Sequence, residues 1–509
     1  MVDLRLWRLI FLILCGISML NGSCYSEKAP YYSFVKPATA APPVVYFDYI
    51  IIGGGTAGCA LAATLSEEAD VLLLERGGSP YGNKNVEDLG SFILNLGDTS
   101  PSSPAQQFIS EDGVINARAR VLGGGSAINA GFFTKASREY VSRVGWDETL
   151  VNQSYEWVEK KVAFEPEVLQ FQSAVRDGLI DAGNQRSRAV GAKFTDERGI
   201  KHRAYLRAGA KVEVIISAGA IGSPQLLMLS GIGPEEELRF HGIDLVSNQP
   251  MVGQGMADNP MNGLLVPSPV PVETSLVQVV GITRFGSYIE AASGSHILSA
   301  WNPNLPQSTE MFFPQTKQKT LMDSTKGYSL INSMINGNIS VGVILEKTIG
   351  PVSKGYLLLK TKNPNDNPFV KFNYFKEPKD LARCVKGMES IIKVIQSGPL
   401  SKFRYPNMSV QVLIDIMLAL PLNLRPRHLS AAASLEQFCK DTVLTIWHYH
   451  GGCQVGKVVD KDYKVFGVDG LRVIDGSTFY DSPGTNPQAT VMMLGRYMGK
   501  KILLERFVD

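Results

Sequence analysis

A glycine-rich segment near the N-terminus is the sequence feature that most restricts the fold. Residues 48–52, DYIII, form an apolar, β-branched stretch, which predicts a strand at the centre of a parallel sheet. The glycines of residues 53–58 follow in G-x-G-x-x-G spacing, and a helical pattern begins at residues 59–65. A second apolar strand, residues 71–74, ends at Glu75. This order of strand, glycine loop, helix and strand predicts a βαβ unit and therefore an α/β domain.

Each glycine of the motif has its own physical role. Gly53 allows the tight turn, Gly55 lets backbone amides approach a pyrophosphate, and Gly58 lets the helix pack closely on the strand. Phosphates would lie at the positive N-terminus of the helix. Glu75 can accept hydrogen bonds from both hydroxyls of an adenosine ribose. The alternative is a glycine-rich turn in an ordinary α/β domain, but the context of the motif favours dinucleotide binding.

A second glycine cluster helps to decide which dinucleotide binds. Residues 120–131 read RVLGGGSAINAG, and short side chains of this kind let a loop pass flat against a large planar ligand. The alternative is an irregular loop between two elements. A second, distant site of close backbone approach favours a long ligand such as FAD over NAD.

Length and charge exclude several other classes of protein. At 509 residues the chain is too long for one ordinary core, so two or three domains are expected. Charged residues make up 19% of the chain and the net charge is +2, without a long basic run, which disfavours nucleic acid and anionic membranes as partners.

The first 24 residues predict a secretory signal peptide. Arg5 and Arg8 precede a short apolar run over residues 9–20, and Gly22 and Ser23 offer a cleavage zone. A membrane anchor is the alternative, but a span needs about 20 apolar residues. We expect a secreted protein without a span in the mature chain. Three N-glycosylation signals fit export, and they begin at Asn152, Asn338 and Asn407.

Residues 445–453, TIWHYHGGC, hold two of the six histidines of the chain. Such a pair can be half of a metal site, a packed strand end, or a general base that faces a ligand. The metal interpretation is weak because neither C-x-x-C, H-E-x-x-H nor a dense acidic cluster accompanies the pair, so no metal is expected. Elsewhere, Cys384 and Cys439 flank an apolar region and can pair as a disulfide, which sequence alone does not establish.

Four colinear blocks cover almost the whole mature chain. They are residues 53–76, residues 120–131, residues 217–234, and the WHYHGG stretch with residues 473–477 and 483–488. Together they resemble the glucose–methanol–choline (GMC) oxidoreductases, and they look most like the plant branch with HOTHEAD-like proteins and (R)-mandelonitrile lyases. A weaker block covers residues 350–355 and 363–366.

The resemblance implies an α/β fold with two domains. A discontinuous FAD-binding, Rossmann-like domain with a parallel sheet would combine residues 44–163, 211–260 and 441–509. A substrate-binding α+β domain, with an antiparallel sheet and helices, would take residues 261–440, where short alternating strands such as 356–360 and a helix over 378–395 are expected.

The connecting region 164–210 departs from the family pattern. Similar proteins carry several tens of additional residues where this chain has residues 181–187. The missing stretch normally supplies strand residues and an apolar contact near the adenine. An unpaired sheet edge or an exposed apolar surface is therefore expected.

The resemblance also implies roles for individual residues. His448 would be the catalytic base at the flavin's reactive face, and Asn486 would donate its amide hydrogens to the developing alkoxide. Trp447 and His450 are candidates for the substrate pocket, although Trp447 can simply be core and His450 suits a structural role better. The implied cofactor-binding residues are Gly53, Gly55, Thr56, Ala57, Gly58, Glu75, Arg76, Val121, Gly125, Ser126, Asn129, Ala130, Gly131, Phe132, Asp475, Gly476, Asn486, Pro487 and Gln488.

Three functions remain open at this point. The first is a secreted, monomeric FAD-dependent alcohol oxidase or dehydrogenase, in which His448 takes the proton of a small-molecule alcohol and hydride passes to the flavin. The second is a hydroxynitrile lyase that retains FAD without a redox step. The third is an inactive, shortened member of the family. Asn486 favours the oxidoreductase, because the lyases considered carry a second histidine there.

Overall fold

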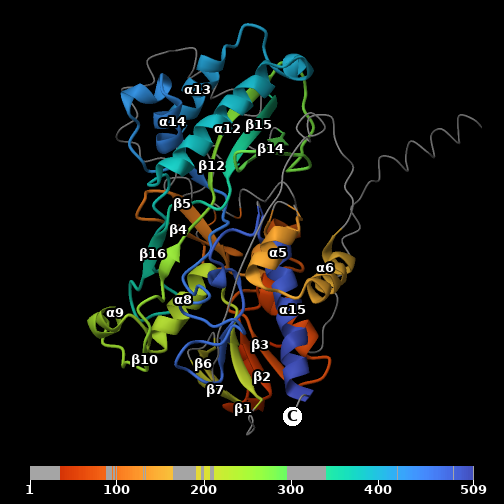
Figure 1. Cartoon of the computed structure of the whole chain (residues 1–509), viewed down its shortest axis with the longest axis vertical. Coiled ribbons are helices and arrows are strands. Elements are labelled where there is room, and N and C mark those ends of the chain that lie inside the picture. The colour runs from red at the N-terminus through yellow and green to blue at the C-terminus, as the bar shows by residue number, and fades with distance from the viewer. Residues whose placement is uncertain are drawn as a thin grey trace, which may run out of the picture.

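The computed structural model of the protein has two main sheets, one toward each end of its long axis (Figure 1). The described residues are 35–87, 95, 98, 100–129, 131, 133–163, 191–196, 200–206, 211–294, 340–420, 422–484 and 486–507. The expected signal peptide, Ala130, Phe132, Asn338 and the shortened stretch 181–187 lie outside these ranges.

The lower sheet in Figure 1 is parallel, with the strand order β19-β8-β2-β3. Its strands are β2 (Tyr49–Ile52), β3 (Val71–Leu74), β8 (Glu213–Ile216) and β19 (Leu471–Val473). β2 lies inside the sheet, as its apolar, β-branched sequence predicts, and Ile50 and Ile51 are fully buried. Within the described residues β3 is an edge strand, and all four of its residues are partly exposed.

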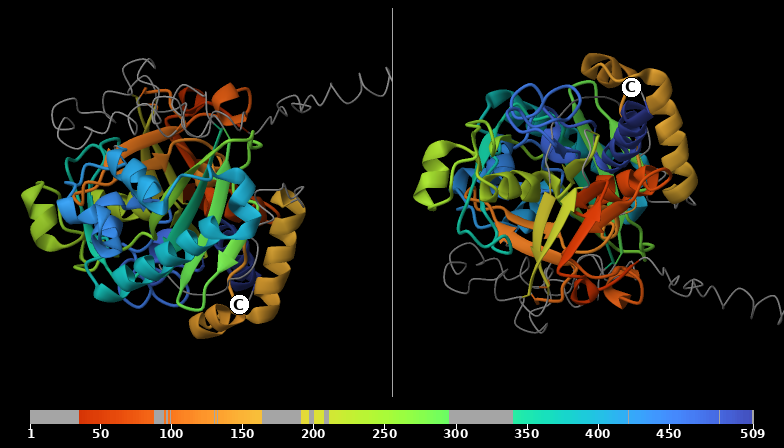
Figure 2. Two further views of the ribbon diagram at one scale, coloured as in Figure 1. Left: turned by 90° about the horizontal axis from the view of Figure 1, so that it is seen from above. Right: turned by 90° about the horizontal axis from the view of Figure 1, so that it is seen from below.

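Two helices cover one face of the parallel sheet and place the glycine motif. α2 (Thr56–Leu65) begins directly after its N-cap Gly55 and packs against the C-terminal helix α15 (Gln488–Phe507). The two backbones lie so close that a Cβ on Gly495 would be 2.3 Å from the carbonyl oxygen of Ala57. α5 (Arg138–Val144) and α6 (Glu148–Val162) flank α15 (Figure 2).

The upper sheet is antiparallel, with the order β13-β14-β15-β12-β18. Its strands are β12 (Pro260–Ser268), β13 (Val280–Ile282), β14 (Ser287–Ser293), β15 (Ser340–Thr348) and β18 (Leu444–Thr445). All nine residues of β12 are buried, because α12 (Pro378–Gln396) and α13 (Val410–Ala419) pack against the sheet. Parallel and antiparallel sheets with helices confirm the expected fold class.

Smaller elements connect the two sheets. A three-stranded sheet joins β1 (Val44–Phe47), β7 (Lys201–Leu206) and β6 (Gly191–Thr195), and a second joins β11 (Gln254–Met256), β16 (Gly355–Leu358) and β17 (Phe369–Lys371). Two-stranded pairs are β4 (Ala105–Ile109) with β5 (Ile115–Ala119), and β9 (Ile232–Gly233) with β10 (Ser247–Asn248). The remaining helices are α3 (Lys84–Glu87), α8 (Gly219–Leu229), α9 (Glu235–Phe240) and α14 (Leu435–Thr442). Short 3₁₀ turns are η1 (Ala38–Ala40), η3 (Gly124–Ser126), η4 (Gly398–Phe403), η5 (Leu429–Ala432) and η6 (Gly476–Thr478).

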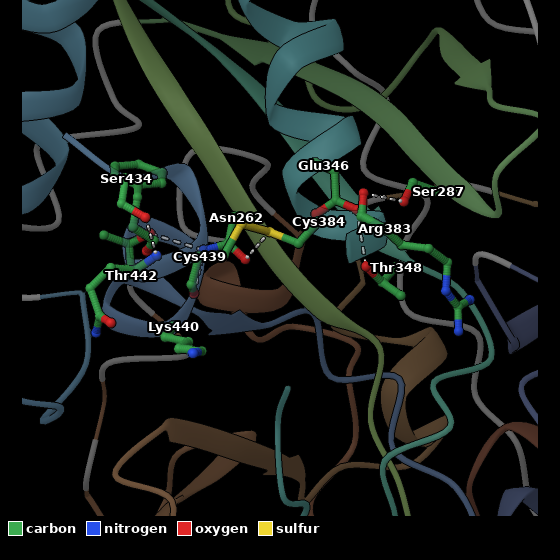
Figure 3. Close-up of a disulfide and its surroundings, with 12 residues drawn as sticks. Asn262, Ser287, Glu346, Thr348, Arg383, Cys384, Ser434, Cys439, Lys440 and Thr442 are labelled. Carbon is green, nitrogen blue, oxygen red and sulfur yellow. Dashed lines mark hydrogen bonds between the residues drawn. A yellow bond between two sulfur atoms is a disulfide. The ribbon is translucent and has the colours of Figure 1, made fainter. Parts of the chain in front are cut away.

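A disulfide joins Cys384 on α12 to Cys439 on α14, and the predicted pairing is confirmed (Figure 3). Both cysteines are fully buried. Asn262 of β12 donates hydrogen bonds to the carbonyl oxygen of Cys439 at 3.0 Å and to the hydroxyl of Thr442 at 2.9 Å. The crosslink therefore fixes α12 and α14 to each other on one face of the antiparallel sheet.

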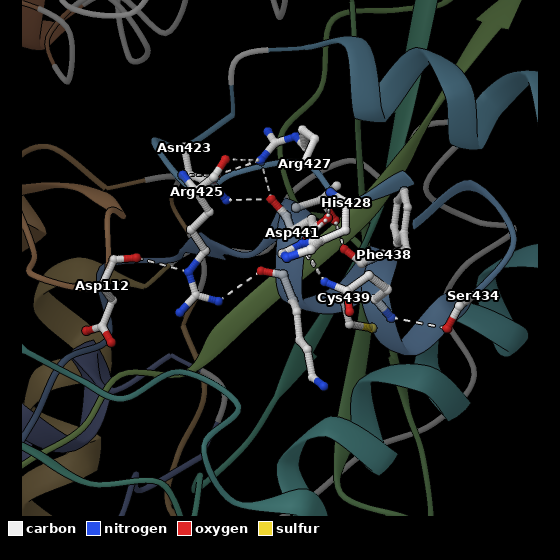
Figure 4. Close-up of polar contacts among 12 residues, drawn as sticks. Asp112, Asn423, Arg425, Arg427, His428, Ser434, Phe438, Cys439 and Asp441 are labelled. Carbon is white, nitrogen blue, oxygen red and sulfur yellow. Dashed lines mark hydrogen bonds and ion pairs between the residues drawn. The ribbon is translucent and has the colours of Figure 1, made fainter. Parts of the chain in front are cut away.

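A polar network holds residues 422–428 against α14 (Figure 4). Arg425 donates to the carbonyl oxygen of Lys440 at 2.8 Å, and Arg427 donates to that of Asp441. These are among the last carbonyls of α14, where positive charge also complements the helix dipole. The network fixes the loop that lies beside β18.

None of the described helices is long and apolar enough to cross a membrane. The two glycosylation signals inside the described ranges have exposed asparagines, Asn152 on α6 and Asn407 before α13.

Candidate active site

A cavity of about 1630 Å³ runs from the glycine motif to the antiparallel sheet. Of the residues expected to bind cofactor or substrate, those that line it are Gly53, Gly55, Thr56, Ala57, Glu75, Arg76, Val121, Gly125, Asn129, Trp447, His448, Asp475, Gly476, Asn486, Pro487 and Gln488. Gly58, Ser126, Gly131 and His450 do not line it. The structure thus brings the N-terminal glycine loops and the C-terminal histidine stretch to one site.

Two positions of the first glycine loop, Gly53 and Gly58, have no room for a side chain. Gly53 has a φ of +108°, and a Cβ there would lie 2.4 Å from the carbonyl oxygen of Ser217. A Cβ on Gly58 would lie 2.0 Å from the carbonyl oxygen of Gly53, which confirms that Gly58 permits close helix packing. The motif is therefore a backbone-lined cradle at the N-terminus of α2.

Glu75 closes the far end of this cradle. Its Oε2 accepts a hydrogen bond from the amide of Gly54 at 2.8 Å, and its Oε1 accepts one from the amide of Gly77 at 2.7 Å. Burial raises the pKa of Glu75, while these amides oppose the rise. Each carboxylate oxygen keeps a lone pair that can accept from a ribose hydroxyl.

The second glycine cluster contacts the first, a contact that the sequence did not reveal. Gly124 has a φ of +58°, and a Cβ on it would lie 2.7 Å from the Cα of Gly55. The hydroxyls of Thr56 and Ser126 hydrogen-bond at 2.8 Å. Asn129 extends the assembly to the C-terminus, because its Nδ2 donates to Oε1 of Gln488 at 2.9 Å. Three distant segments thus form one wall.

Asp475 anchors a further segment of the wall. Its Oδ2 accepts from the amide of Gly219 at 2.8 Å and from the hydroxyl of Ser223 at 2.5 Å, and its Oδ1 accepts from the amide of Ser477 at 2.8 Å. The carboxylate therefore ties the start of α8 to the end of β19. Residues 217–222 consequently line the cavity, and sequence reasoning marked this stretch without assigning it a contact.

His448 is presented to the cavity by a strained turn. The preceding residue, Trp447, has a φ of +58°, in the left-handed region that bulky residues rarely adopt. Its amide donates to the hydroxyl of Thr445 at 2.8 Å. That hydroxyl donates to Oδ2 of Asp258 at 2.6 Å, and Oδ1 of Asp258 accepts from the amide of His448 at 3.0 Å. Asp258 thus holds the turn from both sides.

Asp258 itself is fully enclosed. Besides Thr445 and His448, the hydroxyl of Tyr374 also donates a hydrogen bond to its Oδ2, at 2.5 Å. Burial raises the pKa of Asp258 to about 6, and the hydrogen bonds from Thr445, Tyr374 and His448 limit the rise. Sequence reasoning missed this residue, because an isolated aspartate before a strand carries no motif.

His450 lies behind the wall and does not line the cavity, whereas Trp447 and His448 do. It is 1% exposed, its backbone pairs with that of Ala257, and its Nδ1 lies 3.1 Å from the carbonyl oxygen of His448. Burial lowers its pKa to about 3, so the ring is neutral at physiological pH. The structure supports the packing role for this second histidine. Within the described ranges, acidic, histidine and cysteine side chains form no group of three or more suited to a metal ion.

The end of the cavity under the antiparallel sheet is mostly apolar. Its apolar lining residues are Met261, Leu265, Leu276, Val277, Ala292, Val343, Leu345, Met417, Leu422 and Leu444. His448, Asn486 and Glu290 contribute polar groups to the described lining of this end.

An elongated cavity with a glycine cradle at one end and a histidine at the other defines an enzyme that binds a dinucleotide cofactor. The profile of the GMC oxidoreductase family matches residues 47–177 and 156–261 with its N-terminal part and residues 351–495 with its C-terminal part. The chain belongs to the GMC oxidoreductase family.

Curated relatives cover nearly the whole chain. Protein HOTHEAD of Arabidopsis thaliana is 45% identical over 90% of this chain and 88% of its own length. Sinalpyl alcohol oxidase Nec3 of Nesocodon mauritianus is 37% identical over 94% of this chain and 92% of its own. (R)-mandelonitrile lyase 1 of Prunus serotina is 37% identical over 94% and 90%. The relatives therefore include an oxidase and a lyase.

Solved structures agree on the fold. Pyridoxine 4-oxidase from Mesorbium loti matches with a TM-score of 0.66 at 17% identity, covering 89% of this chain and 98% of its own. Formate oxidase from Aspergillus oryzae matches with a TM-score of 0.67 at 17% identity, covering 91% of this chain and 99% of its own. FAD is the cofactor of this family, and the cradle, Glu75 and the long cavity of this chain fit it.

Proposed function

We propose that the protein is a secreted, monomeric FAD-dependent oxidoreductase that oxidises the CH–OH group of a small-molecule alcohol. The observation that carries the proposal is that His448 and Asn486 line the same cavity as the FAD cradle. The 37% identical alcohol oxidase among the relatives supports it. The apolar wall under the antiparallel sheet favours an alcohol with an apolar body.

His448 is the proposed base. An imidazole has an unperturbed pKa near 6.5, so it can take the hydroxyl proton near neutral pH without a costly shift. When bound, FAD supplies the acceptor for the hydride that leaves the alcohol carbon. The strained turn at Trp447, held by Asp258, keeps the imidazole aimed at that hydroxyl.

Asn486 is the proposed donor to the alcohol oxygen. Negative charge develops on this oxygen as its proton leaves, and an amide N–H already in place stabilises that charge. Pro487 and Gln488 belong to the same wall, where α15 starts with its positive end.

A hydroxynitrile lyase is the second candidate, because (R)-mandelonitrile lyases are also relatives. In that reaction His448 would move the hydroxyl proton of the cyanohydrin, and the flavin would stay oxidised. Asn486 rather than a second histidine favours oxidation.

The deciding experiment is anaerobic mixing of the purified holoprotein with benzyl alcohol, dodecan-1-ol and mandelonitrile in parallel. Oxidation bleaches the flavin absorbance, and [1,1-²H₂]benzyl alcohol bleaches it more slowly. Cyanide release from mandelonitrile without bleaching would instead identify a lyase. A holoprotein that shows neither signal contradicts both proposals.

His448→Ala tests the base. We expect a loss of about 10²- to 10⁴-fold in the rate of flavin reduction, with an unchanged flavin spectrum. His241→Ala is the matched control, because His241 caps α9 outside the cavity. Undiminished reduction in the His448 variant would remove this residue from the mechanism.

A further inference from the structure

A buried ion pair lies in the antiparallel sheet beside the proposed catalytic residues. Lys347 on β15 and Glu290 on β14 are both 0% exposed, and Nζ of Lys347 forms an ion pair with Oε1 of Glu290. Glu290 is opposite Leu345 in the strand register, so Lys347 is its diagonal neighbour on the same face. Glu290 lines the cavity.

Lys347 also contacts the segment that leads into α15. Its Nζ donates a hydrogen bond to Oδ1 of Asn486 at 3.2 Å, across 139 positions of sequence. An ammonium group has donors only, and the oxygen is the acceptor of a carboxamide. The contact therefore defines which branch of the Asn486 amide is oxygen and which is nitrogen.

We propose that Lys347 is a positioning residue that orients the Asn486 amide so that its Nδ2 serves the alcohol oxygen, and that Glu290 is the counter-charge of Lys347. This inference rests on the proposed function. The geometry gives the three groups linked roles, in which Glu290 neutralises the buried ammonium and the ammonium holds Oδ1, so that Nδ2 is the branch of the amide that can donate.

Charge balance explains why both members of the pair are needed. Burial lowers the pKa of Lys347, and the neighbouring Glu290 opposes this by favouring the protonated form. A neutral amine could accept as well as donate, so it would no longer distinguish the two branches of the amide. A pair without net charge also suits an alcohol that enters uncharged.

The proposal predicts where the kinetic loss occurs. Negative charge on the alcohol oxygen develops in the transition state, so a misoriented amide weakens the transition state more than substrate binding. Removal of Lys347 should therefore lower the rate constant of flavin reduction and leave the dissociation constant of benzyl alcohol nearly unchanged.

The test uses holoprotein and anaerobic stopped-flow reduction by benzyl alcohol. The charge-free variant, Lys347→Met/Glu290→Gln, removes both charges of the pair. The other variants are Lys347→Arg, Asn486→Ala, and a triple variant that combines the charge-free pair with Asn486→Ala. We expect the charge-free variant to lose about 10- to 100-fold in the reduction rate constant, less than the roughly 10²- to 10³-fold that removal of an oxyanion donor itself costs, with partial rescue by Lys347→Arg. In the Asn486→Ala background, loss of the pair should have almost no further effect.

Glu346→Gln is the matched control. Glu346 is the neighbouring buried carboxylate on β15, but it faces α12, where a Cβ on Gly387 would lie 2.0 Å from its Cγ. This variant removes a buried carboxylate from the same sheet without touching the Lys347 contact, and its reduction rate constant should stay near that of the wild type.

Additive losses from Lys347 and Asn486, or a weakened dissociation constant with an unchanged rate constant, would overturn the proposal. So would the disappearance of an acid limb from the pH profile of the reduction when Lys347 is replaced, since Lys347 would then act as the base. If the wild type is not reduced by any alcohol, the proposed function fails instead. The same variants are then compared by their midpoints of thermal unfolding. If the shifts of the charge-free variant and of Asn486→Ala add up in the triple variant, the contact between Lys347 and Asn486 is refuted.

Discussion

Asp258→Asn is the substitution that most directly tests how the histidine turn is held. The buried carboxylate has its pKa raised from 3.8 to about 6, although it accepts hydrogen bonds from Thr445, Tyr374 and His448. The raised pKa means that the folded protein binds a proton more tightly than the unfolded chain. The stability from this group is therefore fully present below the unfolded pKa, and is lost as the pH rises through about 6.

The magnitude follows from the size of the shift. About two pKa units at about 1.4 kcal/mol each give about 3 kcal/mol of stability that the wild type loses between pH 4 and pH 7. Asparagine has nearly the same shape and does not titrate. Its oxygen can accept from the amide of His448, and the hydroxyls of Thr445 and Tyr374 can rotate to accept from its nitrogen. The variant should therefore gain on the wild type as the pH rises.

Paired thermal unfolding of holoprotein at several pH values between 4.5 and 7.5 measures this. The wild-type midpoint minus the Asp258→Asn midpoint should fall most steeply near about pH 5, between the unfolded and folded pKa values, and should level off above about pH 6. A difference that stays constant with pH would show that Asp258 keeps an ordinary pKa, and the account of the enclosed carboxylate would be wrong.

Two further substitutions test the cradle and the crosslink. Gly124→Ala places a Cβ 2.7 Å from the Cα of Gly55 at a φ of +58°, so the purified protein should lose its flavin absorbance, whereas Gly145→Ala, at a position with open space around its Cβ, tests the effect of a positive φ alone. Equal flavin content in both variants would contradict the collision. Cys384→Ala/Cys439→Ala removes a bond that closes a 55-residue separation, and chain entropy puts the loss of stability at about 4 kcal/mol. Calorimetry checks this, and a lowering of less than about 1 kcal/mol would contradict the entropic reasoning.

Local patterns predicted the elements that depend on neighbouring residues. The strand expected at residues 71–74 is β3, and the helix expected over residues 378–395 is α12 (Pro378–Gln396). The first helix, expected from residue 59, begins at Thr56, because the helix already starts inside the glycine motif. Backbone periodicity and glycine spacing act over a few residues, which is why these predictions were close.

The contacts that shape the site depend on distant residues and could not be predicted. Asp258 contacts His448 across 190 positions, and Lys347 contacts Asn486 across 139. In the sequence Lys347 stands between Glu346 and Thr348 at the end of an apolar run, where a surface lysine would be expected, yet it is fully buried. Neither hydrophobic period nor any short motif distinguishes these two situations. The resemblance located His448 and Asn486 but not the residues that hold them.

The histidine end and the Glu75 end of the cavity differ in the contacts that hold their walls in place. At the histidine end, every support described above joins segments that the chain retains: Asp258, Asp475 and Asn129 each tie distant backbone together. At the Glu75 end, the wall continues into β3, whose partly exposed edge is open within the described residues. The alignment with one relative spans 566 positions although this chain has 509, so that relative carries residues that this chain lacks.

An inactive, shortened protein would therefore fail through its adenine end. The histidine turn, the disulfide and the Lys347–Glu290 pair would still form, while FAD would bind weakly. FMN lacks the AMP half of FAD and so does not need the Glu75 end. Titration of the protein with both flavins separates the cases: much tighter binding of FAD than of FMN shows that the Glu75 end contributes, and equal weak binding shows that it does not. In the latter case the cradle alone would hold the flavin only weakly, and the proposed oxidation would require a high concentration of free flavin.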